Sequence, residues 1–399
     1  MRILIIKGQS QYGGTRLFCD CAAEAFRRAR HEVEVLDAAD FAPIGAFILA
    51  HARSAGQFDL IFTINILSDF KDALGRTLSD LYGGPHVLWQ TDYILSRFQV
   101  LPGIPRSTAL LVVDPTQADA VRSIYGANRF DYLDFFPHPA VGDLTQDEAD
   151  VSAFLRGRPI EILWSGGYQA PELPWAGAEG VGRQIFDAAL ELALSVEWIP
   201  PHEALDQVLA SYGLDLHDPA HRQLREAAYL IDMEVRRRRR FDFLEALSRT
   251  GLPVRICGAG WDGQHSRFEN AVFDGPVEMT RMVELMTQSR VVLNTNGNFG
   301  AGSHERPFSA SLAGAATFSD FSRYYADVFC SGEDIELFYW QDLDAGIAAL
   351  HALVADPERA FDQARRAKAK TLAHHTWDSG IDHIIAAADH VRSAGAARR

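Results

Sequence analysis

The chain has few cysteines and no long apolar run. It holds four cysteines in 399 residues, at positions 19, 21, 257 and 330. They are too few and too scattered for a disulfide framework, which is typical of proteins from a reducing compartment. The opening sequence MRILIIKGQSQ contains an apolar run too short to span a membrane and no small-residue cleavage site. These absences predict a cytoplasmic protein with no transmembrane segment.

The chain also has no excess of basic charge. Its 53 acidic residues outnumber its 38 lysines and arginines, which gives a formal net charge of -15. This charge argues against general binding of nucleic-acid backbone, although a local basic cleft for phosphate remains open. We expect two domains, because 399 residues with 47% hydrophobic content exceed the size of roughly 250–300 residues at which a single core stops growing.

Apolar strands and amphipathic helices alternate in the first third of the chain. The predicted strands FDLIFTIN and HVLWQTD end at Asn65 and Asp92, and the first strand, RILIIK, precedes the polar loop GQSQYGGT. Ligands of parallel sheets gather at the carboxyl ends of the strands. The strand ALLVVD likewise ends at Asp114. We therefore expect Gln9, Asn65, Asp92 and Asp114 to face one cleft. For any one of them, capping of the following helix is the commoner role.

Three features interrupt this rhythm before it resumes near residue 254. Residues 136–159 lack periodicity and are the best candidate for an interdomain linker, and residues 172–229 are mostly helical in pattern. Five arginines follow at 236–240. Because they cover more than one helical turn, they cannot all point into one site, and a solvated helix face is the favoured interpretation. One or two of them remain candidates for reaching a phosphate.

The pattern as a whole predicts an α/β protein. Its architecture is two facing Rossmann-like, doubly wound domains with an interdomain cleft. The expected boundaries are residues 1–155 for the first, acceptor-binding domain, residues 156–375 for the second, donor-binding domain with a helical insert at about 172–245, and residues 376–399 for a helix that packs back toward the first domain.

The segment from Val291 to Asp320 is the most informative part of the chain. It reads VVLNTNGNFGAGSHERPFSASLAGAATFSD, which is an apolar strand, a glycine-spaced polar loop, a short helix and a second strand that ends in an acid. Glycines let the backbone approach a ligand closely, and the N-terminus of a helix offers unpaired N–H groups to phosphate. The segment therefore predicts a nucleotide site.

Several motifs together resemble the C-terminal domain of GT-B glycosyltransferases, and most of all the spore-maturation-protein type, the CgeB-like family. They are ICGAGW, FDGPV, MVELMTQSRVVLNTN, HERPFSASLAGAATFSD and HHTWDSGIDHII. In the N-terminal half, HVLWQTD, VVDPTQADAVRSIYG and YLDFFPHPA are similar to family segments. The resemblance implies a GT-B fold and transfer of a sugar from a nucleoside-diphosphate sugar, UDP-sugar before others, to an acceptor.

Donor residues follow from the resemblance and from the chemistry of a departing diphosphate, which needs cations and N–H groups. Arg306 suits that role, and His304 is a second catalytic candidate that donates to phosphate or to a sugar hydroxyl. The expected donor-binding residues are Ser165, Gly166, Gly258, Gly260, Trp261, Val277, Asn296, Gly302, Ser303, Glu305, Phe308 and Ser309.

Ser309 departs from the family's pattern. Related enzymes commonly carry Arg, any residue, Phe, Glu here, with the Glu on the donor ribose, whereas this chain has Arg306-Pro307-Phe308-Ser309. A hydroxyl cannot take the place of a carboxylate that accepts from two ribose hydroxyls. Either Glu305 takes that role from a shifted position, or the donor is held differently.

The acceptor side is expected in the N-terminal half. Asp92 is the candidate general base if the reaction inverts configuration, and it positions the acceptor if the reaction retains it. The loop from Gln9 to Thr15 offers amides, glycines and an aromatic ring for hydrogen bonding and stacking. The expected acceptor-binding residues are Gln9, Gln11, Tyr12, Gly13, Gly14, Asn65, Trp89 and His138.

No metal and no resident cofactor are expected. Asp342 and Asp344 resemble a metal-binding pair, but they lie at a predicted helix start, where capping explains them better. The partners are then the nucleotide-sugar donor and a glycan, protein or small-molecule acceptor. Two other functions remain open at this point, a nucleotide-sugar epimerase of the same architecture and a non-catalytic nucleotide- or glycan-binding protein.

Overall fold

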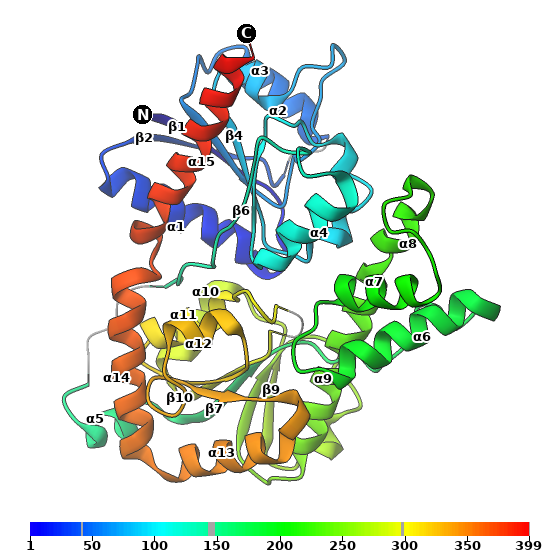
Figure 1. Ribbon diagram of the computed structural model, residues 1–399. Coiled ribbons are helices and arrows are strands. Elements are labelled where there is room, and N and C mark those ends of the chain that lie inside the picture. The colour runs from blue at the N-terminus through cyan, green and yellow to red at the C-terminus, as the bar shows by residue number, and fades with distance from the viewer. Residues whose placement is uncertain (41–42, 143–147, 297–298, 399) are drawn as a thin grey trace. The chain divides into compact units, whose positions relative to one another are not determined.

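The computed structural model describes residues 1–40, 43–142, 148–296 and 299–398. The chain forms two compact units, Met1–Pro137 together with Thr376–Arg399, and His138–His375. The first unit is therefore built from both ends of the sequence, blue to cyan and red in Figure 1, and the second is one continuous stretch. Within the described residues, no helix is long and apolar enough to cross a bilayer.

The first unit contains a six-stranded, fully parallel sheet with the order β2-β1-β3-β4-β5-β6. Its strands are β1 (Arg2–Lys7), β2 (Glu32–Asp37), β3 (Leu60–Ile64), β4 (His86–Gln90), β5 (Ala109–Val112) and β6 (Tyr132–Phe135). Its helices are α1 (Gly14–Arg28), α2 (Ile44–Ala52), α3 (Leu78–Tyr82), α4 (Pro115–Tyr125) and α15 (Trp377–Ala397). The apolar runs form these strands because central parallel strands are buried on both faces.

Helix α15 packs against α1 of the first unit. The Trp377 ring lies 5.6 Å from the Trp89 ring and 6.4 Å from the Phe18 ring. At the same end of the helix, Asp378 forms an ion pair of 2.9 Å with Arg28 of α1. Aromatic burial and this ion pair hold the last helix on the first unit.

The second unit contains a second parallel sheet with the order β12-β11-β10-β7-β8-β9. Its strands are β7 (Ile160–Ser165), β8 (Val254–Cys257), β9 (Ala271–Gly275), β10 (Ser289–Asn294), β11 (Ala316–Asp320) and β12 (Glu336–Phe338). Its helices are α5 (Val151–Gly157), α6 (Gly180–Ser195), α7 (Pro201–Ser211), α8 (Arg222–Glu226), α9 (Ala228–Ser248), α10 (Met279–Thr287), α11 (Glu305–Leu312), α12 (Arg323–Val328), α13 (Leu343–Ala355) and α14 (Pro357–His374).

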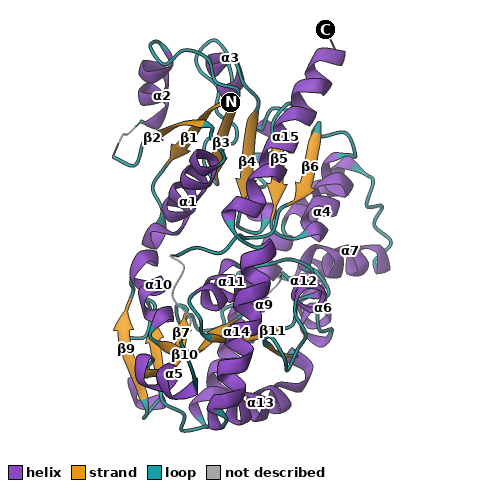
Figure 2. Cartoon of the chain, turned by 90° about the vertical axis from the view of Figure 1, so that its left-hand side faces the viewer, coloured by secondary structure: helices purple, strands orange, loops and turns teal. Residues whose placement is uncertain are grey.

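Alternation along β10 divides the core of the second unit into two layers. Val291 and Leu293 belong to a cluster with Phe243 of α9, whereas Val292 packs with Met286 of α10 on the opposite face. Successive side chains of a strand point to opposite faces, so both faces of the sheet need a helical cover. Figure 2 shows helices, in purple, flanking the orange strands of this unit.

Helices α6, α7 and α8 are an insertion between β7 and α9, and α6 and α7 both contact α9. They are the green helices of Figure 1. The sequence predicted a helical insert in this region. It also predicted a domain boundary near residue 155, whereas the division lies at Pro137. The segment after Pro137 belongs to the second unit because the amide N–H groups of His138 and Val141 donate to Ser303 and Ser309 of that unit.

Candidate functional site

Polar side chains meet at the carboxyl edge of the second sheet. The neighbouring parallel strands β10 and β11 end at Asn294 and Asp320, and α11 begins beyond them at Glu305. Both strand ends are buried, with Asn294 fully inaccessible. Buried polar groups at the end of a strand must find partners, and the partners found here connect both strands to the first turn of α11.

Arg306 is the cation of this edge. Its Nη1 donates to Asn294 Oδ1 at 2.8 Å, and Asn294 Nδ2 in turn donates to Ser319 Oγ at 2.9 Å. Burial lowers the pKa of Arg306, and the charge of Glu305 opposes that shift. Arg306 as a whole residue is partly exposed. A charged donor held in a fixed position is suited to bind an anion.

Asn296, Asp320 and Tyr325 form the layer beneath. Asn296 N donates to Asp320 Oδ1 at 2.6 Å, and Tyr325 donates its hydroxyl proton toward Asn296 Oδ1 at 3.0 Å. Burial raises the pKa of Tyr325 well above its ordinary value, so its phenol stays protonated. Asn296 Nδ2 is buried and has no hydrogen-bond partner among the described residues. A buried amide N–H without a hydrogen-bond partner costs free energy unless a ligand or a water molecule accepts from it. Asn296 Nδ2 therefore marks a place where a ligand or water would bind.

His304 and Glu305 form an acid–imidazole pair at the start of α11. His304 Nδ1 lies 2.7 Å from Glu305 Oε2. Burial alone would raise the pKa of the Glu305 carboxyl, but the interactions with His304 and Arg306 hold it well below its usual range. Glu305 is therefore an anion, and it fixes His304 with the Nδ1 proton directed to the carboxylate. A carboxylate engaged in this way is poorly placed to take two ribose hydroxyls as well.

His138 supports the loop before α11. Its amide N donates to Ser303 Oγ at 2.8 Å, and its Nδ1 donates to the Ser303 carbonyl at 2.9 Å. Burial lowers the pKa of His138 to about 3, so the ring is neutral. His138 was predicted to bind the acceptor and Ser303 to bind the donor. Both are buried and bonded to each other, which gives them the role of holding the loop.

Phe308 and Ser309 also lie inside the second unit. Neither side chain is accessible to solvent. Ser309 Oγ accepts a hydrogen bond of 3.0 Å from Val141 N, and the Phe308 ring stacks on His375 at 4.4 Å. These two predicted donor residues have no exposed face for a ligand. Ser309 therefore lies at a position that packs against the segment at 138–141.

The predicted glycine turns pack against one another. A Cβ at Gly258 would lie 2.3 Å from the carbonyl oxygen of Gly166, and one at Gly260 would lie 2.3 Å from the carbonyl oxygen of Tyr168. Trp261 Nε1 donates to the Gly166 carbonyl at 3.1 Å. Glycine is required here because the loop after β8 touches the loop after β7, where Ser165 ends the strand. Close contact between these two loops therefore accounts for glycine at positions 258 and 260.

The remaining predicted donor residues lie at the rim. Val277 is partly buried in the loop before α10 and packs on the apolar layer under that helix. Gly302 is buried, and its carbonyl accepts a hydrogen bond of 2.5 Å from Ser322 Oγ. Both hold loops at the carboxyl edge through packing or backbone bonds.

The carboxyl edge of the first sheet brings together Asn65, which was predicted to bind the acceptor, and Asp92, which was predicted to be catalytic. Asn65 follows β3 with a φ of 59°, and its Nδ2 donates to Thr91 Oγ1 at 2.7 Å and to Asp92 Oδ2 at 3.1 Å. Asp92 is exposed after β4. Arg97 Nη2 donates to the Asn65 carbonyl at 3.3 Å. A non-glycine residue held at positive φ costs energy, and such strain clusters at functional sites.

The loop after β1 lines a shallow hollow in the first unit. Gln9, Gln11 and Tyr12 are exposed, and Tyr12 has a φ of 57°. Gly13 has a φ of 70° and precedes Gly14, the first residue of α1. The hollow has a volume of about 510 Å³ and is lined by Gln9, Ser10, Gln11, Arg16, Ala39 and Asp40. Amides and a hydroxyl of this kind suit a polyhydroxylated ligand.

Trp89 lies elsewhere. Its side chain is fully buried, 5.3 Å from the Phe136 ring and 5.6 Å from the Trp377 ring. Trp89 was predicted to bind the acceptor, but every residue of β4 is buried, so both faces of this central strand are covered and the Trp89 ring lies in the core.

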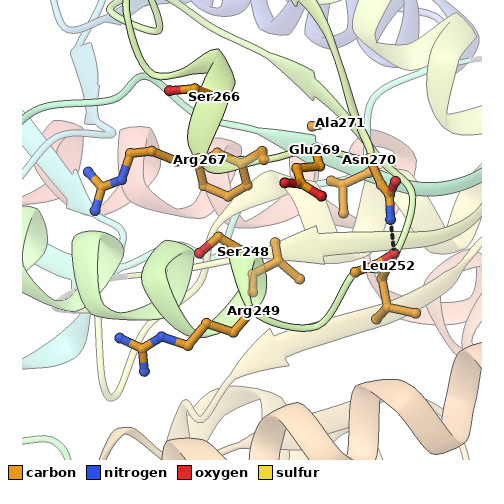
Figure 3. A pocket seen from close by; sticks show the side chains of 12 residues that line it. Ser248, Arg249, Leu252, Ser266, Arg267, Glu269, Asn270 and Ala271 are labelled. Carbon is orange, nitrogen blue, oxygen red and sulfur yellow. Dashed lines mark hydrogen bonds between the residues drawn. The ribbon is translucent and has the colours of Figure 1, made fainter.

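A further pocket of about 280 Å³ lies at the opposite, amino edge of the second sheet, where β8 and β9 begin. Figure 3 shows Asn270 donating from Nδ2 to the Gly251 carbonyl, and the side chains of Arg249 and Arg267 extending to the same side. Arg267 pairs with Glu245. Ligands of parallel sheets gather at the other edge, so this pocket is separate from the site around Arg306.

Among the described residues, no group of three or more His, Cys, Asp or Glu side chains is arranged to hold a metal ion. Asp342 caps α13, with its carboxylate accepting from Ala345 N at 3.1 Å, as predicted. The expectation of a metal-independent reaction stays a prediction.

Four members of these clusters were not predicted from the sequence: Asn294, Tyr325, Thr91 and Arg97. Asn294 carried a signal, because it is the first polar residue after an apolar strand. Tyr325 carried none. It lies 19 positions after Arg306 in an ordinary amphipathic helix, and only the fold brings it under the loop.

Two comparisons with known proteins bear on the site. Residues 236–386, less than half of the chain, match the sequence model of a family described as glycosyl transferase-like. No curated protein matches the chain. The solved structures include many similar chains.

Three solved structures illustrate the likeness. Alr3699/HepE from Anabaena, in complex with UDP-glucose, is 12% identical with a TM-score of 0.52 and 100% of both chains covered. Sucrose-phosphate synthase (tll1590) from Thermosynechococcus elongatus is 12% identical with a TM-score of 0.55, covering 99% of this chain and 100% of that one. An α-glucosyltransferase in complex with UDP is 12% identical with a TM-score of 0.57, covering 98% of this chain and 100% of that one.

Likeness at this level of identity shows the fold. Two doubly wound α/β units with six parallel strands each, matched over nearly the whole length of these glycosyltransferase structures, identify the architecture. The chain has the GT-B fold, and its second unit carries most of a segment that matches the glycosyl transferase-like family model.

Proposed function

We propose that this chain is a glycosyltransferase that moves a sugar from a nucleoside-diphosphate sugar to a hydroxyl of an acceptor. The observation that carries the proposal is the position of Arg306, in the first turn of α11, bonded to Asn294 at the end of β10 and partly exposed. A departing diphosphate develops negative charge, which a fixed guanidinium and the N–H groups at a helix start stabilise. The glycosyl transferase-like match and the UDP-bound neighbours support the same reaction.

A UDP-sugar is the first donor to test, because the neighbours hold UDP or UDP-glucose. The motifs around Arg306 favour the CgeB-like family within the GT-B enzymes. The cations in this proposal are side chains, so the reaction needs no metal ion. In the first unit, exposed Asp92 is the candidate base for an acceptor hydroxyl if configuration inverts.

The test is a pair of arginine variants measured by titration with UDP and by release of UDP from UDP-glucose and other UDP-sugars across an acceptor panel. Arg306→Ala removes a charged hydrogen-bond donor, so we expect UDP binding to weaken roughly 10- to 100-fold and transfer to be lost. Arg290→Ala is the matched control, because Arg290 lies on the same strand as Asn294 but at its amino end, bonded to the Arg158 carbonyl at 3.0 Å.

The outcomes separate the candidate functions. Unchanged turnover in Arg306→Ala would refute the site. Tight UDP binding with no transfer to any acceptor would instead indicate a non-catalytic binding protein. Release of an epimerised or free sugar without an acceptor would indicate an epimerase of the same fold.

A further inference from the structure

Helix α9 carries five consecutive arginines, 236–240, just before it packs on the sheet. Two of them are neutralised by acids one turn earlier in the same helix. Arg236 pairs with Asp232 at 2.7 Å, and Arg238 pairs with Glu234 at 2.8 Å. Both acids are buried, so these two arginines have fixed structural partners.

The next two arginines hold the helical insert and the loop after β7. Arg237 donates to Gln169 Oε1 at 3.3 Å and to the Glu172 carbonyl at 3.4 Å. Arg239 is buried and donates through Nη2 to backbone carbonyls of the insert. These are the carbonyls of Ala193, Val196 and Glu197, each at 3.1 Å. Neither guanidinium is left without a partner.

Arg240 differs from the other four. Within the described part of the chain it makes no hydrogen bond and no ion pair, and its Nε is buried. Burial, together with the charges of Arg306 and Arg236, lowers the pKa of Arg240 to about 10, while the charge of Asp320 opposes the shift. The side chain is only partly exposed. It is thus a half-buried cation close to a second cation.

The position of Arg240 follows from the path of α9. This helix connects β7 to the parallel strand β8, so it runs from the carboxyl edge of the sheet toward the amino edge. Phe243 stacks over the sheet, 5.2 Å from the Phe338 ring and 5.4 Å from the Trp164 ring. Arg240 is three residues earlier, about 4.5 Å nearer the carboxyl edge at the helical rise per residue. It therefore lies on the side of the sheet where Asp320 ends β11.

Positive charge exceeds negative charge at this edge. Arg239, Arg240 and Arg306 all interact with the single carboxylate of Asp320. Arg239 also interacts with Glu197, and Arg306 with Glu305, whereas Arg240 shares Asp320 alone. Asp320 is itself occupied by Asn296 N and by Trp340 Nε1 at 3.1 Å. A half-buried cation with so little compensation is unfavourable until an anion joins it.

We propose that Arg240 is a second anion-binding residue of this site and that it contacts the diphosphate of the donor together with Arg306. The inference rests on the proposed function for the identity of the anion. It assigns to one arginine of the run a role that the other four cannot take, because their guanidinium groups are already bonded. It also predicts that a diphosphate binds better than a single phosphate, since two guanidinium groups match two phosphates.

Calorimetric titrations of the whole protein with inorganic pyrophosphate, UDP, UMP and uridine test the inference. Arg240→Met keeps the length of the side chain and removes its charge. We expect this variant to bind UDP and pyrophosphate roughly 10- to 100-fold more weakly, with uridine affinity unchanged and the melting temperature of the free protein equal or higher, because a repulsion is removed. Arg237→Met is the matched control from the same helix, and we expect no loss of affinity for either anion.

The controls keep the two proposals apart. Arg240→Lys retains the charge and should recover part of the affinity, which a purely structural role would not produce. Unchanged UDP and pyrophosphate affinity in a folded Arg240→Met, with Arg306→Ala impaired, overturns the role of Arg240 and leaves the proposed function standing. Pyrophosphate binding that depends on Arg240 without any UDP binding supports the anion site and refutes the nucleotide donor. Absence of binding of both ligands to the unaltered protein refutes both.

Discussion

Replacing Ser309 distinguishes a donor contact from a structural one. Ser309 Oγ accepts the Val141 N–H at 3.0 Å in a fully buried position. Ser309→Ala leaves that N–H unsatisfied, which costs about 1–3 kcal/mol. For a unit of 150–250 residues, 1 kcal/mol corresponds to roughly 2–4 °C, so the second unit should melt about 2–12 °C lower. Affinity for UDP should stay the same at a temperature where the variant is folded.

Ser311→Ala is the matched control for this change. Ser311 lies in the same helix and is equally buried, but its hydroxyl donates to the Pro307 carbonyl inside the helix at 2.7 Å. Its removal leaves no N–H without a partner, so the loss of stability should be smaller. Melting curves and UDP titrations of both variants are the assay. A Ser309→Ala protein with unchanged stability and at least tenfold weaker UDP binding would refute the reasoning, because the hydroxyl would then face the donor.

Two other changes test the loops and the buried histidine. Gly260→Ala places a Cβ 2.3 Å from the Tyr168 carbonyl oxygen, whereas the control Gly263→Ala, also at positive φ, meets no atom within 4 Å. Thermal melting should therefore show a much larger loss of stability for Gly260→Ala. Equal losses of stability in the two variants would contradict the contact between the loops. His138 should make stability depend on pH, because its folded pKa of about 3 lies below the ordinary 6.5 and the unfolded chain takes up the proton first as the pH falls. Unfolding free energy measured with denaturant should therefore decrease progressively from about pH 6.5 toward pH 3, and His138→Gln should flatten that decrease; an unchanged slope would show that another group is responsible.

The architecture could be predicted because its signals are local. Buried parallel strands are apolar runs, and the central strands of both sheets, such as β3, β4 and β10, coincide with such runs in the sequence. The GT-B fold is confirmed by the two parallel sheets and by the solved structures that match along the chain. The prediction of a glycosyltransferase agrees with the family match over residues 236–386.

The site could be predicted only in part, because side-chain direction depends on the fold. Arg306 could be chosen from its place at a helix start, and it lies beside buried Asn294. Ser309 and Trp89 were predicted from neighbouring motif residues, yet Ser309 lies on the buried face of α11 and Trp89 lies on a strand that is covered on both faces. The inference about Arg240 depends on the hydrogen-bond and ion-pair partners of the other four arginines. Their partners lie up to 68 positions away in the sequence, which no local pattern reveals.

The order of synthesis follows from the way the two units divide the chain. The second unit is complete once residue 375 has been made, whereas the first unit still lacks α15. Until α15 has been synthesised, Trp89 and Phe18 cannot contact Trp377, and Asp131 cannot form its ion pair with Arg398. Translation therefore completes the second unit first, and the unit that begins the sequence is the last to close its core.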